Sequence, residues 1–109
     1  MIKNFPIAEV VELAEMVTYQ PGQVVSRTIS QNKMGGMTLF AFPEGEGLST
    51  HTTPADAVAY ILDGEAHIEI GDDAMVASAG KAVVMPANIP HALLAKRPFK
   101  MLLIIVKGE

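Results

Sequence analysis

The chain has 109 residues, half of them hydrophobic, a formal net charge of -4 and no cysteine. This length fits one domain of roughly 100–150 residues, and the acidic balance argues against a nucleic-acid binder, which would show a basic stripe. The missing cysteine excludes thiol catalysis, disulfides and thiolate metal sites.

The first segment of the chain predicts the only helix. Apolar residues recur at helical spacing behind a proline and predict a short helix over residues 6–13. Acidic residues lie within this apolar stretch and no small-residue cleavage site follows, so it is not a signal peptide, and a cytoplasmic protein is expected. A single domain over 1–109 is expected, with an N-terminal helix and strand in 1–22 and a barrel in 23–109.

Beyond this segment the pattern changes to short runs rich in valine, isoleucine and threonine, separated by glycine, proline and aspartate. Turn signals at intervals of about 8–12 residues are typical of an all-β sandwich or barrel. Strands are expected at residues 15–19, 23–30, 37–42, 48–52, 57–62, 65–70, 74–78, 82–85, 91–95 and 99–106.

The clearest hairpin is predicted at Asp63 and Gly64, because a two-residue turn of this composition supplies the backbone angles that match strand twist. In the strand that follows, residues 65–70, apolar and polar residues alternate, so one face is apolar and points inward. His67 shares the polar face with two glutamates. A solvent-facing position is therefore favoured for His67 over a ligand role, which stays open.

The last strand, residues 99–106, is apolar on both faces, which fits a central strand or one covered by a partner chain. Its apolar run is far shorter than the roughly 18–20 residues that cross a bilayer, so no membrane span is expected. A homodimer is expected instead. Tyr60 should lie opposite Ala57, in packing or on the dimer surface, and Arg27 should either pair with a glutamate across the dimer or be exposed.

Two patterns of glycine and histidine lie in the middle of the chain. In each, five residues separate the leading glycine from the next defining residue, and about forty residues separate the two histidines. The first pattern consists of Gly45, His51 and Gly64, and the second of Gly80, Pro86 and His91.

These patterns, in this order, resemble the two motifs of the cupins. The resemblance implies a small double-stranded β-helix, or jelly-roll barrel, with His51 and His91 brought together inside it. It also implies a divalent metal, such as manganese, iron, nickel or zinc. In cupins the ligands are usually two histidines and a glutamate of the first motif and the histidine of the second.

The chain departs from the cupin motifs at two of these four ligand positions. Thr53 stands where the second histidine is expected, and Ala57 stands where the glutamate is expected. Asp56 is adjacent, but neighbouring strand residues face opposite sides, so it should point away from His51. A non-haem iron site takes two histidines and a carboxylate, so His51 and His91 alone should bind a metal weakly.

Three functions remain open from the sequence. The favoured one is a small cupin that binds a small molecule in the barrel, with a pocket formed by His51, Thr53, Met85 and His91. The second is a metal-dependent oxygenase or isomerase in which water completes a site of His51 and His91. The third is an interaction domain, a dimer with a vestigial pocket. The fold cannot choose between them.

Overall fold

The computed structural model describes residues 1–108, which are almost entirely β-structure. Their helical element is a 3-10 turn, η1 (Leu13–Glu15), and the described part of the chain has no helix long and apolar enough to cross a membrane. Its nine strands are β1 (Val25–Asn32), β2 (Gly35–Phe42), β3 (Gly47–His51), β4 (Ala55–Asp63), β5 (Glu65–Ile70), β6 (Asp73–Ser78), β7 (Ala82–Met85), β8 (His91–Leu94) and β9 (Phe99–Lys107).

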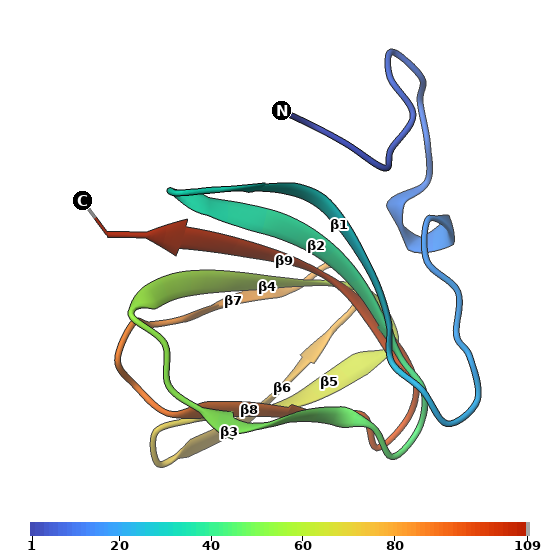
Figure 1. Ribbon diagram of the computed structural model, residues 1–109. Coiled ribbons are helices and arrows are strands. Elements are labelled where there is room, and N and C mark those ends of the chain that lie inside the picture. Colours follow the sequence, from blue (N-terminus) through green and yellow to red (C-terminus); the bar gives the residue numbers. More distant parts are fainter. Residues whose placement is uncertain (109) are drawn as a thin grey trace.

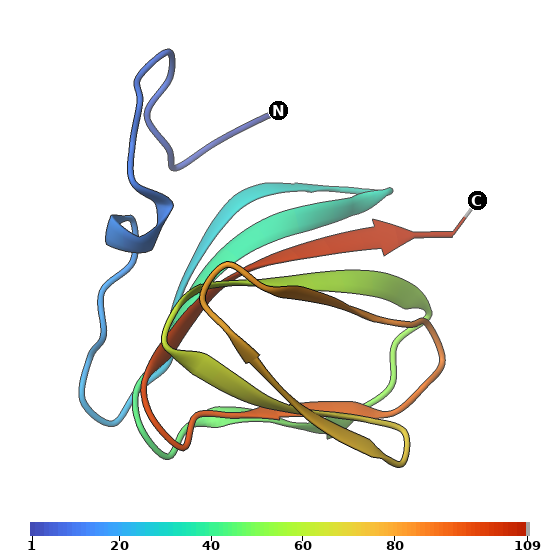
Figure 2. The same cartoon turned by 180° about the vertical axis from the view of Figure 1, so that it is seen from behind.

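The strands form two antiparallel sheets that face one another. The large sheet has the order β1-β2-β9-β4-β7, and the small sheet has the order β3-β8-β5-β6. The sheets meet on the right of Figure 1 and diverge towards the β3–β4 and β7–β8 connections on the left; Figure 2 shows the same arrangement from behind. The predicted all-β barrel is confirmed, and β9 is a central strand between β2 and β4.

Aromatic packing closes the end of the barrel where the sheets meet. The rings of Phe42 and Phe99 stack with centroids 4.7 Å apart, and both side chains are fully buried. Ile61 and Met101, in register on β4 and β9, are also fully buried there. Such aromatic pairs contribute about 0.5–1.5 kcal/mol beyond the burial of their area, so this end anchors the two sheets to each other.

Towards the other end the inward side chains are less completely buried. Leu103 and Ile105 of β9 pack against the core cluster but remain partly exposed. They lie in register with the alanines Ala59 and Ala57 of β4. An inward side chain on a central strand is fully buried where the core is filled, as Met101 is. Inward side chains of β9 therefore remain within reach of solvent at this end, which we call the open end.

The predicted short N-terminal helix is confirmed as the 3-10 turn η1, but its position differs. The helical turn η1 lies later in the chain than residues 6–13, and residues 6–12 form no helix. Arg27 accounts for this: its Nε donates a hydrogen bond to the Asn4 carbonyl oxygen at 2.6 Å, and Nη1 donates to the Met16 carbonyl oxygen at 2.9 Å. An isolated helix of this length is unstable in water, so these contacts with the barrel determine the conformation. Arg27 was expected either to pair with a glutamate across a dimer or to be exposed; it is half-buried, and these contacts are with backbone carbonyls of its own chain.

The strand predicted over residues 15–19 does not form. Only an isolated bridge joins Gln20 to Gln23. Val17 is instead buried on the outer face of the large sheet, in one cluster with Leu39 and Ala41. The apolar residues of this stretch thus cover a sheet face without adding a strand to it. Periodicity in the sequence does not distinguish a strand from an irregular segment that packs on a sheet in this way.

Tyr19 fastens this segment to the barrel. Its hydroxyl donates a hydrogen bond to the Asp63 carboxylate, and Lys100 Nζ lies 4.9 Å from the centre of its ring. Burial, followed by the hydrogen bond and the charge of Asp63, raises the pKa of Tyr19 well above its usual value. The folded chain therefore favours the neutral phenol.

We expect the free energy of unfolding of Tyr19→Phe to fall less steeply than that of the wild type as the pH rises into the alkaline range. The contribution of a group with a raised pKa is complete below its unfolded pKa, about 10 for tyrosine, and is lost as the pH rises above that value. Near neutral pH the variant should lose about 1 kcal/mol of unfolding free energy with the hydrogen bond. Urea unfolding of both proteins between neutral pH and the alkaline range measures this, and parallel profiles would contradict it.

Candidate functional site

His51 and His91 lie side by side at the open end. His51 ends β3, His91 begins β8, and the two are cross-strand partners in the small sheet. Their ring centroids are 4.4 Å apart, with the rings inclined at 66°. His91 is 4% exposed, whereas His51 is exposed. The structure thus brings together the two histidines of the motifs, one lining the interior and one facing solvent.

Backbone carbonyls fix the protonation pattern of both neutral rings. His51 Nδ1 lies 2.8 Å from the Ser49 carbonyl oxygen, and His91 Nδ1 lies 3.2 Å from the Ile89 carbonyl oxygen. A carbonyl oxygen only accepts, so Nδ1 carries the proton in each neutral imidazole and Nε2 carries the lone pair. The pair therefore presents two Nε2 acceptors, each on a ring oriented by its own strand.

Residues of four strands supply apolar side chains to this part of the barrel. Ile70 of β5 is the cross-strand partner of His91. Across the barrel, Ala57 of β4 lies in register with Ile105 of β9 and with Met85 of β7. Met85 is 1% exposed and belongs to the core cluster. Met85 thus belongs to the packed interior, while Ile70 and Ile105 are partly exposed.

Thr53 lies in the β3–β4 connection. Its Oγ1 donates a hydrogen bond to the Ala55 carbonyl oxygen at 3.2 Å, and its own carbonyl accepts from the backbone N–H of Asn88. Both bonds hold the connections that flank the open end. The hydroxyl proton is therefore engaged with the backbone, and Thr53 shapes the rim of the site.

The residues present do not make up the metal site that the cupin motifs imply. Asp56 Oδ1 accepts a hydrogen bond of 2.7 Å from the Ala87 backbone N–H and is exposed, so it faces away from the histidines as predicted. Ala57 has no donor atom. Within residues 1–108, no three histidine, aspartate or glutamate side chains are grouped so that they could hold an ion. Two imidazoles without a carboxylate do not complete either a zinc site or a non-haem iron site.

His67 lies on the other side of the small sheet. Its Nε2 is 3.9 Å from a Glu65 carboxylate oxygen, and its side chain is 28% exposed. It lines an outer groove of about 320 Å³ together with residues that include Val76 and Leu94. The groove was not predicted from the sequence, although apolar residues at outward positions of neighbouring strands, such as Val76, indicate an apolar outer surface.

The fold and the paired histidines define the class of protein: a small β-barrel with two histidines paired at its open end. The family model described as Cupin domain matches residues 38–105, and the chain belongs to this family. A comparison with curated proteins finds no match.

Solved structures extend the likeness over the whole chain. A conserved protein of unknown function from Streptococcus pyogenes is 40% identical, with a TM-score of 0.96, over 99% of this chain and 95% of that one. A cupin superfamily protein from Desulfitobacterium hafniense is 30% identical, with a TM-score of 0.94, over 99% of both chains. A cupin 2 conserved barrel domain protein from Leptotrichia buccalis is 42% identical, with a TM-score of 0.83, over 86% of this chain and 46% of that one.

Proposed function

We propose that the chain binds a small molecule at the open end of the barrel, with His51 and His91 as its polar contacts. One observation carries this proposal: two rings with centroids 4.4 Å apart each have Nδ1 engaged by a backbone carbonyl, so each ring is oriented and keeps Nε2 as an acceptor before any ligand arrives. Binding sites are typically apolar concavities with a few convergent polar groups. The partly exposed Ile105 and Leu103 supply the apolar wall.

The chemistry of the pair selects the class of ligand. Two acceptors side by side match a molecule with two adjacent hydrogen-bond donors, such as a vicinal diol or a catechol. Ile70, the cross-strand partner of His91, and Ala57 of the facing sheet carry no charge to bind an ionic group, so the rest of the ligand is apolar. A ligand of this class satisfies both Nε2 atoms and covers the inner faces of Leu103 and Ile105.

We expect catechol to bind at this site and its dimethyl ether, which has no donors, to bind more weakly. Histidine ring resonances followed by NMR during titration measure this, and the shifts should fall on His51 and His91. Each of His51→Ala and His91→Ala should weaken binding about three- to tenfold, the value of one hydrogen bond. His67→Ala is the matched control, because His67 lies on the outside of the small sheet. Equal binding of the two compounds, or an equal effect of His67→Ala, would refute the proposal.

A metal-dependent activity is the second candidate, favoured by the same hydrogen bonds. Metal-binding histidines usually donate their other ring N–H to a carbonyl or a carboxylate, as both rings do here. Manganese, iron, nickel or zinc would then be held by the two Nε2 atoms, with water in the remaining positions. Metal analysis of protein purified without chelators tests this: about one ion per chain, lost in His51→Ala and in His91→Ala, would support it.

A further inference from the structure

The connection between β7 and β8, residues 86–90, carries the group that orients His91. It runs from the large sheet to the small sheet on the left of Figure 1. Within it, the carbonyl oxygen of Ile89 lies 3.2 Å from His91 Nδ1. The hydrogen bond made by one ring nitrogen decides which nitrogen of a neutral histidine carries the proton. The position of this one peptide group therefore determines whether His91 Nε2 is an acceptor.

Three hydrogen bonds hold the β7–β8 connection, two before Ile89 and one after it. In them the Ala87 N–H donates to Asp56 Oδ1 at 2.7 Å, the Asn88 N–H to the Thr53 carbonyl oxygen at 2.8 Å, and the Gly71 N–H to the Pro90 carbonyl oxygen at 2.8 Å. The first of these bonds is the one that a side chain accepts. Hydrogen bonds to a carboxylate are also roughly twice as strong as those between neutral groups. Asp56 is therefore a strong restraint on this connection.

The shape of the connection depends on such restraints. Asn88 has a φ of +65°, in the left-handed region, which is uncommon for a residue other than glycine. Conformations of this kind persist where surrounding contacts hold them. Asp56 points outward from β4, next to the inward Ala57, and touches neither histidine. It can act on His91 only through the connection.

We propose that Asp56 is a positioning residue for His91: its carboxylate holds the β7–β8 connection so that the Ile89 carbonyl keeps the proton of the neutral ring on Nδ1. Without the carboxylate the connection loosens, and a part of the molecules carries the proton on Nε2. In that tautomer Nε2 donates and no longer accepts. His91 is 4% exposed, so little solvent replaces the lost bond. The consequence for binding rests on the proposed function, whereas the tautomer of His91 is measurable without a ligand.

We expect Asp56→Ala to change the tautomer of His91 and to leave that of His51 unchanged, since the Ser49 carbonyl in β3 holds the His51 ring. Proton–nitrogen NMR spectra of the ligand-free chain distinguish a protonated from an unprotonated ring nitrogen, at about pH 8.5, where imidazoles are ordinarily neutral. Asp56→Leu has a similar volume and no acceptor, and should behave as Asp56→Ala does. Asp56→Asn keeps an oxygen acceptor for the Ala87 N–H and should give the wild-type spectrum.

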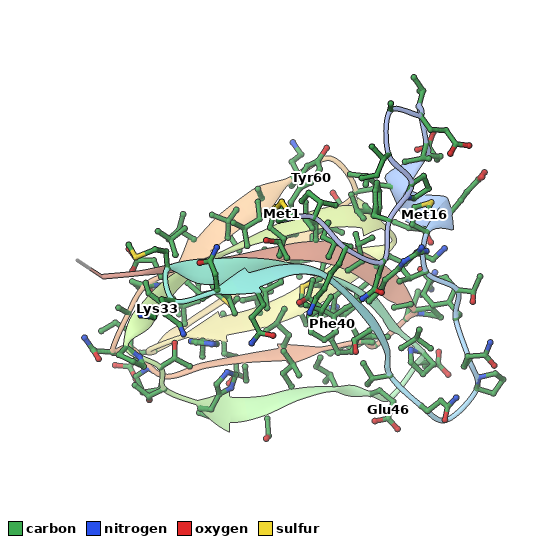
Figure 3. All side chains as sticks on the ribbon, turned by 45° about the horizontal axis from the view of Figure 1, so that its top comes forward. Met1, Met16, Lys33, Phe40, Glu46 and Tyr60 are labelled. Atoms are coloured by element: carbon green, nitrogen blue, oxygen red, sulfur yellow. The ribbon has the colours of Figure 1, made fainter. Side chains whose placement is uncertain are left out.

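Asn32→Ala is the matched control. Asn32 Oδ1 accepts a hydrogen bond of 2.8 Å from the Met34 backbone N–H, so this variant also loses a bond between a side-chain oxygen and the backbone of a connection. Asn32 lies in β1, three strands away from β4 in the large sheet. Figure 3 shows the next residue, Lys33, and Glu46 towards opposite ends of the barrel. The control should leave the tautomer of His91 as it is in the wild type.

Catechol titration tests whether Asp56 acts through His91. Asp56→Ala should weaken binding by up to the three- to tenfold of one hydrogen bond. The double variant with His91→Ala should bind no more weakly than His91→Ala alone, because residues that act as a unit are not additive. If catechol binds none of these proteins while the tautomer responds, the positioning role stands and the proposed function fails. A His91 ring that keeps its Nδ1 proton in both Asp56→Ala and Asp56→Leu would overturn the inference, as would an equal change in Asn32→Ala.

Discussion

Gly64→Ala should destabilise the fold by at least 3 kcal/mol, a large share of the roughly 5–15 kcal/mol that holds a domain together. Gly64 has a φ of +71°, in the left-handed region, where a residue with a Cβ costs about 1–2 kcal/mol. A Cβ at this position would also lie 2.2 Å from the Pro98 carbonyl oxygen and 3.1 Å from the Phe99 Cα. Those are backbone atoms, so the β4–β5 turn or the start of β9 must move.

Gly80→Ala separates the two causes. Gly80 has a φ of +88°, but a Cβ there would meet nothing within 4 Å. Gly80→Ala should therefore lose only the free energy that a left-handed backbone conformation costs a residue with a Cβ, about 1–2 kcal/mol. Urea unfolding followed by circular dichroism measures both variants, and the excess for Gly64→Ala reports the close approach to β9. Equal losses of unfolding free energy in the two variants would show that the backbone near Pro98 moves away from the added Cβ at no cost.

The barrel could be predicted because its signals are local. The alternation in residues 65–70 predicted which side chains of β5 face inward, and the structure confirms it, with Ala66 and Ile68 buried. Strand alternation likewise placed Asp56 on the outside. The two-residue period of a strand is set by the backbone itself, so it does not depend on contacts with the rest of the chain. The hairpin predicted at Asp63 and Gly64 is wrong, however, because β4 and β5 do not pair: at Gly64 the chain passes from the large sheet to the small sheet.

The N-terminal segment and the site depend on contacts between distant residues, which the sequence does not display. The helical spacing of residues 6–13 is overridden because Arg27, in β1, binds the carbonyls on either side of that stretch. The spacing of the motifs did predict that His51 and His91 meet. It did not predict that backbone carbonyls fix both rings, nor that Leu103 remains partly exposed. Those features follow from the β3 and β8 connections and from the alanines of β4.

Restoring the two departed motif residues should strengthen metal binding at the histidine pair. Thr53→His with Ala57→Glu would add a nitrogen and a carboxylate to His51 and His91, giving the four donors that the cupin motifs contain. Ala57 is 7% exposed on the inner face, so the introduced carboxylate is buried and its charge is uncompensated without a metal. We expect the metal-free variant to be less stable than the wild type and nickel or zinc to reverse the loss.

Calorimetric titration and thermal melting with and without zinc measure this gain. The double variant should bind at least about a thousandfold more tightly than the wild type, which at saturating zinc amounts to about 4 kcal/mol of added stability. Thr53→His with Val58→Glu is the matched control, because Val58 lies one residue further along β4 and faces outward, where its carboxylate cannot join the histidines. If the wild type binds zinc as tightly as the double variant, His51 and His91 suffice without a carboxylate. The metal-dependent activity would then displace ligand binding as the leading function.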